Sequence, residues 1–371
     1  MAKEGAVIIP EPRVNPYLVG HETAQQDYLQ AWESGRLAHA WLIAGPRGIG
    51  KATLAYRMAR YALAQKGKAA DVDMLGTPAP KSLAMSAEDP VFRRVASQGH
   101  ADFRAIERPW ADNKQLKRKT VIGVDEVREI GTFLSMTPSE GGWRAVVIDA
   151  ADEMNTNAAN AVLKVLEEPP KRALLFLVAH NADRLLPTIR SRCRGLDLRP
   201  LTEAQVKALI NRYQPDMKAT NTNALAVLAD GSIGRALELE EEGGVELFQA
   251  MMALLGDLPR LNVTRLHKLS DQVLKGDAFR TLSGLLSWWL ARVTRASAAG
   301  ALGELHEIVP GEAELARRMM TAANPAAWAD VWERINTLAR RADAVNLDRK
   351  RTLMLMLLAV EQTAASMPAV A

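Results

Sequence analysis

Ala40-Trp41-Leu42-Ile43-Ala44-Gly45-Pro46-Arg47-Gly48-Ile49-Gly50-Lys51-Ala52-Thr53 is the stretch that decides the fold. Its first five residues are apolar and predict a buried strand, and Lys51 to Leu63 predict the helix that follows. Residues 45–51 fit the pattern G-x-x-x-x-G-K, which forms a phosphate-binding loop where it joins a strand to a helix. In such a loop the backbone N–H groups point at phosphate oxygens, and Lys51 is expected to neutralise the β- and γ-phosphates.

Alanine occupies two positions that ATP hydrolysis requires. The loop normally ends in Ser or Thr, whose hydroxyl ligates Mg²⁺, but this chain has Ala52. Thr53 comes one residue too late, because one residue turns a helical side chain by about 100°. Asp149 ends a predicted strand as a Mg²⁺-binding aspartate would, yet Ala150 replaces the acid that orients the attacking water. The sequence therefore predicts a site that does not hydrolyse ATP, and leaves open whether the loop binds nucleotide or persists as an empty rigid connection.

The surrounding segments predict a parallel sheet with helices on both faces, that is, an α/β P-loop domain. Further apolar runs predict buried strands at Phe103–Ile106, Arg144–Ile148 and Leu174–Val178. A helix is expected from Asn155 to Leu166, and Asp152 and Glu153 are expected to cap its start.

Length and composition favour several domains in a soluble protein. For 371 residues we expect an α/β core at 1–199, a small helical lid at 200–242 and an all-α domain at 243–371. Gln65–His100 reads as an irregular insertion and Glu240–Gly244 as a linker.

The composition also limits the classes of function. We expect no membrane segment and no signal sequence, because the apolar runs are short, so the cytoplasm is the expected location. Its single cysteine, Cys193, excludes an internal disulfide and a four-cysteine zinc module, and we expect no zinc and no dedicated metal site. The net charge of +4 gives only weak support for nucleic-acid binding.

Four further segments make a family resemblance specific. They are Val124–Arg128, Asn157–Pro170, Leu186–Cys193 and Gly231–Leu237. Together with the phosphate loop they resemble bacterial DNA polymerase III clamp-loader subunits of the AAA+ class, and among these the non-hydrolysing one. The likeness implies an AAA+ domain, a helical lid and an all-α collar domain. Many family members carry a four-cysteine zinc module after the first helix, and this chain departs from that pattern.

The resemblance implies roles for individual residues. Arg192, in Ser191-Arg192-Cys193, is implied to be an arginine finger that acts in trans on a neighbouring subunit's nucleotide. Arg235 lies where the family places a phosphate-sensing arginine, and either this role or that of a plain surface arginine is open to it. The roles of His180 and Asn181, at a predicted strand end, also stay open. The expected nucleotide site, intact or vestigial, comprises Gly45, Pro46, Arg47, Gly48, Ile49, Gly50, Lys51, Ala52, Thr53, Asp149 and Arg235, with ATP or ADP and Mg²⁺ as its ligands.

The implied assembly is a five-subunit ring that loads a sliding clamp onto primed DNA. The implied partners are the ATPase subunits, the delta subunit, the clamp and, through the complex, primer–template DNA. This chain would be the structural subunit of a DNA polymerase III holoenzyme, a nucleotidyltransferase, and would itself lack ATPase activity. Trp288, Trp289 and Leu290 would line the collar interface, or else form core within their own domain.

Two other functions remain open from the residues. The first is an active AAA+ ATPase, either the clamp-loader motor or a DNA-remodelling enzyme. The second is a free-standing DNA-binding adaptor that uses the basic residues Lys114, Lys117, Arg118 and Lys119.

Overall fold

The computed structural model describes residues 10–65, 82–111, 118–274 and 277–366. The described chain divides into two compact units, an α/β unit of residues 8–209 and 230–235 and a helical unit that holds 210–229 and 236–371. None of the described helices is long and apolar enough to span a bilayer.

A five-stranded parallel sheet, in the order β2-β3-β4-β1-β5, forms the centre of the α/β unit. Its strands are β1 (Ala40–Ala44), β2 (Phe103–Glu107), β3 (Arg144–Asp149), β4 (Ala173–Ala179) and β5 (Arg194–Asp197). Alternate side chains point to opposite faces: Trp41 and Ile43 of β1 enter one core, while Ala40 and Leu42 enter the other. The predicted sheet is confirmed, with helices on both faces.

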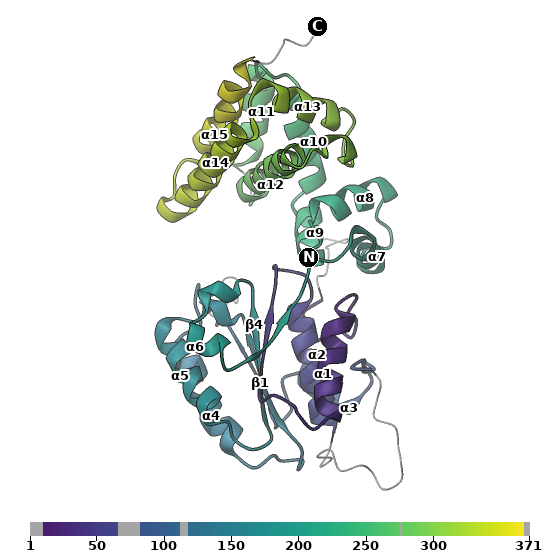
Figure 1. Ribbon diagram of the computed structural model, residues 1–371, viewed down its shortest axis with the longest axis vertical. Coiled ribbons are helices and arrows are strands. Elements are labelled where there is room, and N and C mark those ends of the chain that lie inside the picture. Colours follow the sequence, from purple (N-terminus) through teal and green to yellow (C-terminus); the bar gives the residue numbers. More distant parts are fainter. Residues whose placement is uncertain (1–9, 66–81, 112–117, 275–276, 367–371) are drawn as a thin grey trace, which may run out of the picture. The chain divides into compact units, whose positions relative to one another are not determined.

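Figure 1 shows α1, α2 and α3 on one side of the sheet and α4, α5 and α6 on the other. The helices of this unit and of the segment after it are α1 (Glu22–Glu33), α2 (Lys51–Ala64), α3 (Pro90–Ala96), α4 (Val124–Ser135), α5 (Thr156–Glu167), α6 (Pro187–Arg190), α7 (Glu203–Tyr213), α8 (Ala219–Leu228) and α9 (Ile233–Glu241), with short 3₁₀ turns at Ala151–Glu153 and Ala182–Arg184. The reading of Gln65–His100 as wholly irregular is wrong, because α3 lies within it; residues 66–81 fall outside the described ranges.

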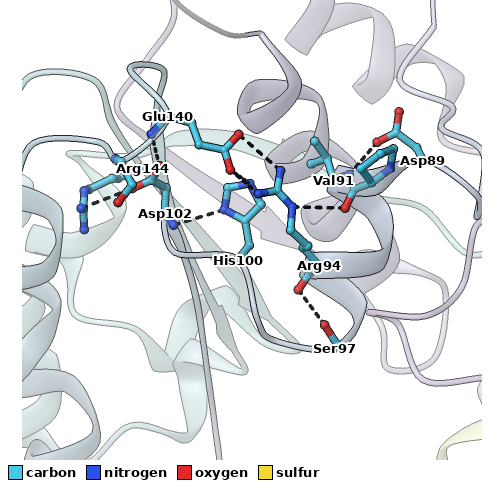
Figure 2. Close-up of polar contacts among 10 residues, drawn as sticks. Asp89, Val91, Arg94, Ser97, His100, Asp102, Glu140 and Arg144 are labelled. Carbon is cyan, nitrogen blue, oxygen red and sulfur yellow. Dashed lines mark hydrogen bonds and ion pairs between the residues drawn. The ribbon is translucent and has the colours of Figure 1, made fainter.

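A buried polar network fastens the amino edge of the sheet (Figure 2). Asp102, just before β2, is 1% exposed and pairs at 3.2 Å with Arg144, the 5% exposed first residue of β3. The Asp102 carboxylate also accepts the N–H groups of Ser139 and Glu140, and the Glu140 side chain pairs with Arg94 of α3. This network ties α3 and the loop ahead of β3 to the sheet.

The helical unit has its own core. Its helices are α10 (Gly244–Leu255), α11 (Val263–Gln272), α12 (Ala278–Ala298), α13 (Glu312–Ala322), α14 (Pro325–Val345) and α15 (Arg349–Thr363), with 3₁₀ turns at Leu302–Glu304 and Ala364–Ser366. Trp288, Trp289 and Leu290 are buried in this core, so they are not exposed for an interface. The predicted linker is wrong in extent, because α9 runs to Glu241 and α10 begins at Gly244.

Candidate phosphate-binding site

The phosphate loop has the conformation that its glycines predict. It leaves β1 at Ala44 and enters α2 at Lys51, and Gly45, Gly48 and Gly50 have φ angles of 143°, 75° and 102°. Residues with a Cβ rarely adopt such angles. A Cβ on Gly48 would also collide with the Ser232 hydroxyl and crowd the backbone of Gly234.

Protein contacts hold the loop from two sides. His21, the residue before α1, donates from Nε2 to the carbonyl oxygen of Ile49 at 2.7 Å. The N–H of Gly234 donates to the carbonyl oxygen of Gly48 at 3.0 Å. These two bonds use backbone carbonyl groups of the loop as acceptors, so contacts within the chain hold the loop at Gly48 and Ile49.

Donors on the loop are available for an anion. In the described part of the chain, no protein oxygen accepts the N–H groups of Gly48 to Ala52, which is normal for the unpaired start of a helix. Lys51 is 3% exposed and donates from Nζ to the carbonyl oxygen of Pro46. Burial lowers the pKa of Lys51 to about 8, opposed by the charges of Asp149 and Asp152.

Acidic groups stand at the strand ends beside the loop. Burial, and then the charge of Glu107, raises the pKa of Asp149, the last residue of β3, to about 6, and Lys51 acts in the opposite direction. Asp152 accepts the backbone N–H groups of His180 and Asn181 at 2.9 and 3.0 Å.

The expected capping role of Asp152 and Glu153 is therefore wrong. Glu153 pairs with Arg108 at 2.8 Å, and the side chain of Asn155 caps α5 by accepting the N–H of Ala158. The acids serve longer-range contacts, because α5 carries its own cap.

His180 and Asn181 differ in their surroundings at the end of β4. Burial lowers the pKa of His180 to about 4, and the Lys51 charge acts in the same direction, so the imidazole is neutral near pH 7. Its buried Nδ1 has no hydrogen-bond partner among the described residues. The Asn181 side chain instead accepts the N–H of Asp183. His180 is thus the one of the two whose side chain has a buried polar atom without a partner among the described residues.

Arg192 lies at the other end of the sheet from the phosphate loop. β5 pairs with β1 so that Arg194 lies opposite Trp41 and Asp197 opposite Ala44. At about 3.3 Å per residue, Arg194 is about 10 Å from the level at which the loop begins, and Arg192 precedes it. The Arg192 side chain, 36% exposed, pairs with Glu167 at 3.0 Å and donates to the carbonyl oxygen of Thr188.

The other residues that the sequence singled out make contacts within the chain or are buried. The N–H of Arg235 donates to the Ser232 hydroxyl in the first turn of α9. Thr53 is buried at 6% exposure, and burial raises the pKa of the Cys193 thiol to about 12. Arg118 pairs with Glu107 and lies over the Trp110 ring, whereas Lys114 and Lys117 fall outside the described ranges.

Sequence reasoning missed the contacts that fix the loop from outside. His21 lies 28 residues before Ile49, and nothing in its neighbourhood marks it as a partner of the loop. The Gly234 contact could have been suspected from the glycines flanking Ser232 and Ile233, since glycine allows close backbone approach.

The sheet order, the phosphate loop and the helical segments after β5 define a P-loop protein of the AAA+ class. A family model described as "DNA polymerase III, delta subunit" matches residues 20–202. The delta' subunit of Pseudomonas aeruginosa is 35% identical over 56% of this chain and 57% of its own length, and that of Escherichia coli is 30% identical over 69% and 66%. The tau subunit of Bacillus subtilis is 27% identical over 72% of this chain and 45% of its own length.

The chain belongs to the delta' family of DNA polymerase III clamp-loader subunits. The matched region spans 57% and 45% of the first two relatives, little more than half of the one and less than half of the other.

Proposed function

We propose that the chain is a non-hydrolysing subunit of the replicative clamp loader and donates Arg192 in trans to the nucleotide of a neighbouring ATPase subunit. In this role it would help to load the sliding clamp onto primed DNA. The position of Arg192 carries the proposal: the side chain is partly exposed at the edge of the sheet opposite its own phosphate loop. Its ion pair with Glu167, which is 51% exposed, is of a kind that contributes about 0–1 kcal/mol, so the guanidinium can be released at little cost.

The proposal also rests on the two alanines. Ala52 offers no hydroxyl for a metal, and Ala150 offers no carboxylate for water. Magnesium-dependent ATP turnover by the isolated chain, abolished by Lys51→Ala, would instead favour the active-ATPase alternative.

The test is DNA-stimulated ATP hydrolysis by the complex reconstituted with its cognate subunits, clamp and primed DNA. Arg192→Ala and Arg192→Lys are both expected to slow single-turnover hydrolysis at the neighbouring site, because lysine lacks the forked pair of donors. Arginine fingers in other phosphoryl-transfer systems contribute roughly 10³- to 10⁵-fold.

Two variants serve as controls once equal assembly is confirmed by size-exclusion chromatography. Arg190→Ala removes a neighbouring arginine that pairs with Asp183, and it should leave the rate unchanged. Glu167→Ala removes only the intrachain partner of Arg192. If Glu167→Ala slowed the rate as much as Arg192→Ala, Arg192 would serve its own domain and not a neighbour.

A further inference from the structure

The phosphate loop has donors for an anion but lacks the oxygen ligands for the metal that usually accompanies a bound nucleotide. Lys51 is 3% exposed, and no carboxylate of the described chain lies within ion-pair distance of Lys51 or Arg47. The N–H groups of Gly48 to Ala52 are also available to an anion, since no protein oxygen in the described part accepts them. The charges of Asp149 and Asp152 only partly offset the cost of burying the Lys51 ammonium group, so this arrangement favours an anionic ligand.

The residues present do not fit Mg²⁺. This ion requires near-octahedral oxygen coordination, and in a phosphate loop the protein supplies a Ser or Thr hydroxyl directly. Ala52 has no such oxygen, and Thr53 is buried in the core. Each oxygen of Asp152 already accepts a backbone N–H at the end of β4.

The remaining acids at this edge are also engaged. Glu153 pairs with Arg108, and Glu107 pairs with Arg118 while accepting the Tyr56 hydroxyl. Asp149 is therefore the one acid described at this edge without such a partner. In P-loop proteins one carboxylate does not hold Mg²⁺ without the loop hydroxyl.

We propose that the loop binds a nucleoside diphosphate as the metal-free anion, with Lys51, Arg47 and the loop N–H groups in place of Mg²⁺. The diphosphate is favoured over the triphosphate. Without a metal between them, a γ-phosphate and the Asp149 carboxylate at the strand end repel each other, whereas the α- and β-phosphates face donors only. The ligand would be held and not turned over. This inference is independent of the role proposed for Arg192.

The experiment is equilibrium binding of ADP and ATP to the full chain, by calorimetry and with a methylanthraniloyl-labelled ADP, in EDTA and in excess Mg²⁺. We expect ADP to bind equally well or better in EDTA, because Mg²⁺ competes for the nucleotide in solution. ATP should bind more weakly than ADP in EDTA. Lys51→Ala should abolish binding, and Arg192→Ala should leave it unchanged.

Ala52→Ser is the matched variant, because it restores only the missing hydroxyl. It should gain tighter binding in Mg²⁺ than in EDTA, by about tenfold for one added charge-assisted contact. Three results would overturn the proposal: at least tenfold weaker ADP binding by the native chain in EDTA, binding that survives Lys51→Ala, or no binding by the native chain at millimolar ADP. Thermal melting of each variant separates lost binding from lost folding.

Discussion

Replacing Asp102 by alanine is expected to destabilise the α/β unit by about 3 kcal/mol. Asp102 is the counter-ion of Arg144, and the two side chains are nearly inaccessible to water (Figure 2). Removing one partner of a buried pair usually costs about 3–5 kcal/mol, because the other charge stays buried alone.

The surroundings of Arg144 place the loss at the lower end of this range. Its guanidinium keeps the carbonyl oxygens of Phe133 and Thr137 as acceptors at 2.9 and 2.8 Å, and it lies 4.8 Å from the Phe133 ring centroid. The two N–H groups that Asp102 accepts, of Ser139 and Glu140, belong to a loop that water reaches, so their loss adds little. The double variant Asp102→Ala/Arg144→Met should recover most of the loss, since apolar residues often replace a buried ion pair without penalty.

Hydrogen–deuterium exchange of β3 peptides in increasing urea measures this effect in the α/β unit alone. A global unfolding curve is less suitable, because a chain with two compact units need not unfold in one step. Asp183→Ala is the control: its pair with Arg190 is exposed, and we expect a change below about 1 kcal/mol. The reasoning fails if Asp102→Ala costs under about 1 kcal/mol, or if the double variant is as unstable as the sum of the two single ones.

Two other predictions concern buried acids. The pKa of Asp149 is raised from 3.8 to about 6, so its ionised form opposes folding fully above pH 6, and this cost disappears as the pH falls below the unfolded pKa. Asp149→Asn should therefore raise the urea midpoint of β3 peptide exchange more at pH 8 than at pH 5, by a free-energy difference of about 1 kcal/mol, and an equal gain at both pH values would contradict the burial argument. In the helical unit, Glu312 is 1% exposed, accepts the Trp289 indole N–H and pairs with Arg292. Glu312→Ala should cost about 3–5 kcal/mol when hydrogen–deuterium exchange of α12 peptides is followed in increasing urea, and an unchanged midpoint would show that Arg292 finds another partner.

The sequence predicts those strands that consist of consecutive apolar residues. β1 has the bounds expected, the predicted β3 lacks one residue at its end, and the predicted β4 lacks one residue at each end. β5 was not predicted, because Arg194-Gly195-Leu196-Asp197 has one buried residue and forms a strand only by pairing with β1 at the sheet edge. α3 could have been found: Asp89 is an N-cap followed by Pro90 at the first helical position, a recognised start signal.

In the site, too, features set by neighbouring residues can be predicted from the sequence, whereas contacts between distant residues cannot. The loop conformation follows from glycines within seven consecutive residues, so the motif predicts it. The bonds from His21 and Gly234 come from distant parts of the chain. No local pattern indicates the His21 bond, whereas the glycines around Ser232 and Ile233 give only a general sign that backbone segments approach closely there. Asp152 was misread for the same reason: an acid near a helix start favours a capping role, whereas its partners lie 28 and 29 residues further along.

Packing within the chain explains why the loop contains Gly48, but it does not explain why the loop contains Lys51. Gly48 is required by its positive φ and by the approach of Ser232 and Gly234, so the glycine would be needed even if nothing ever bound. The same cannot be said of Lys51. Its side chain is buried, and the charges of Asp149 and Asp152 do not offset this burial, which lowers its pKa to about 8, so the lysine weakens the ligand-free fold. A residue that opposes the fold it belongs to is best explained by a bound anion, and this makes Lys51, more than the glycines, the reason to expect a nucleotide at a site that has lost its metal ligand.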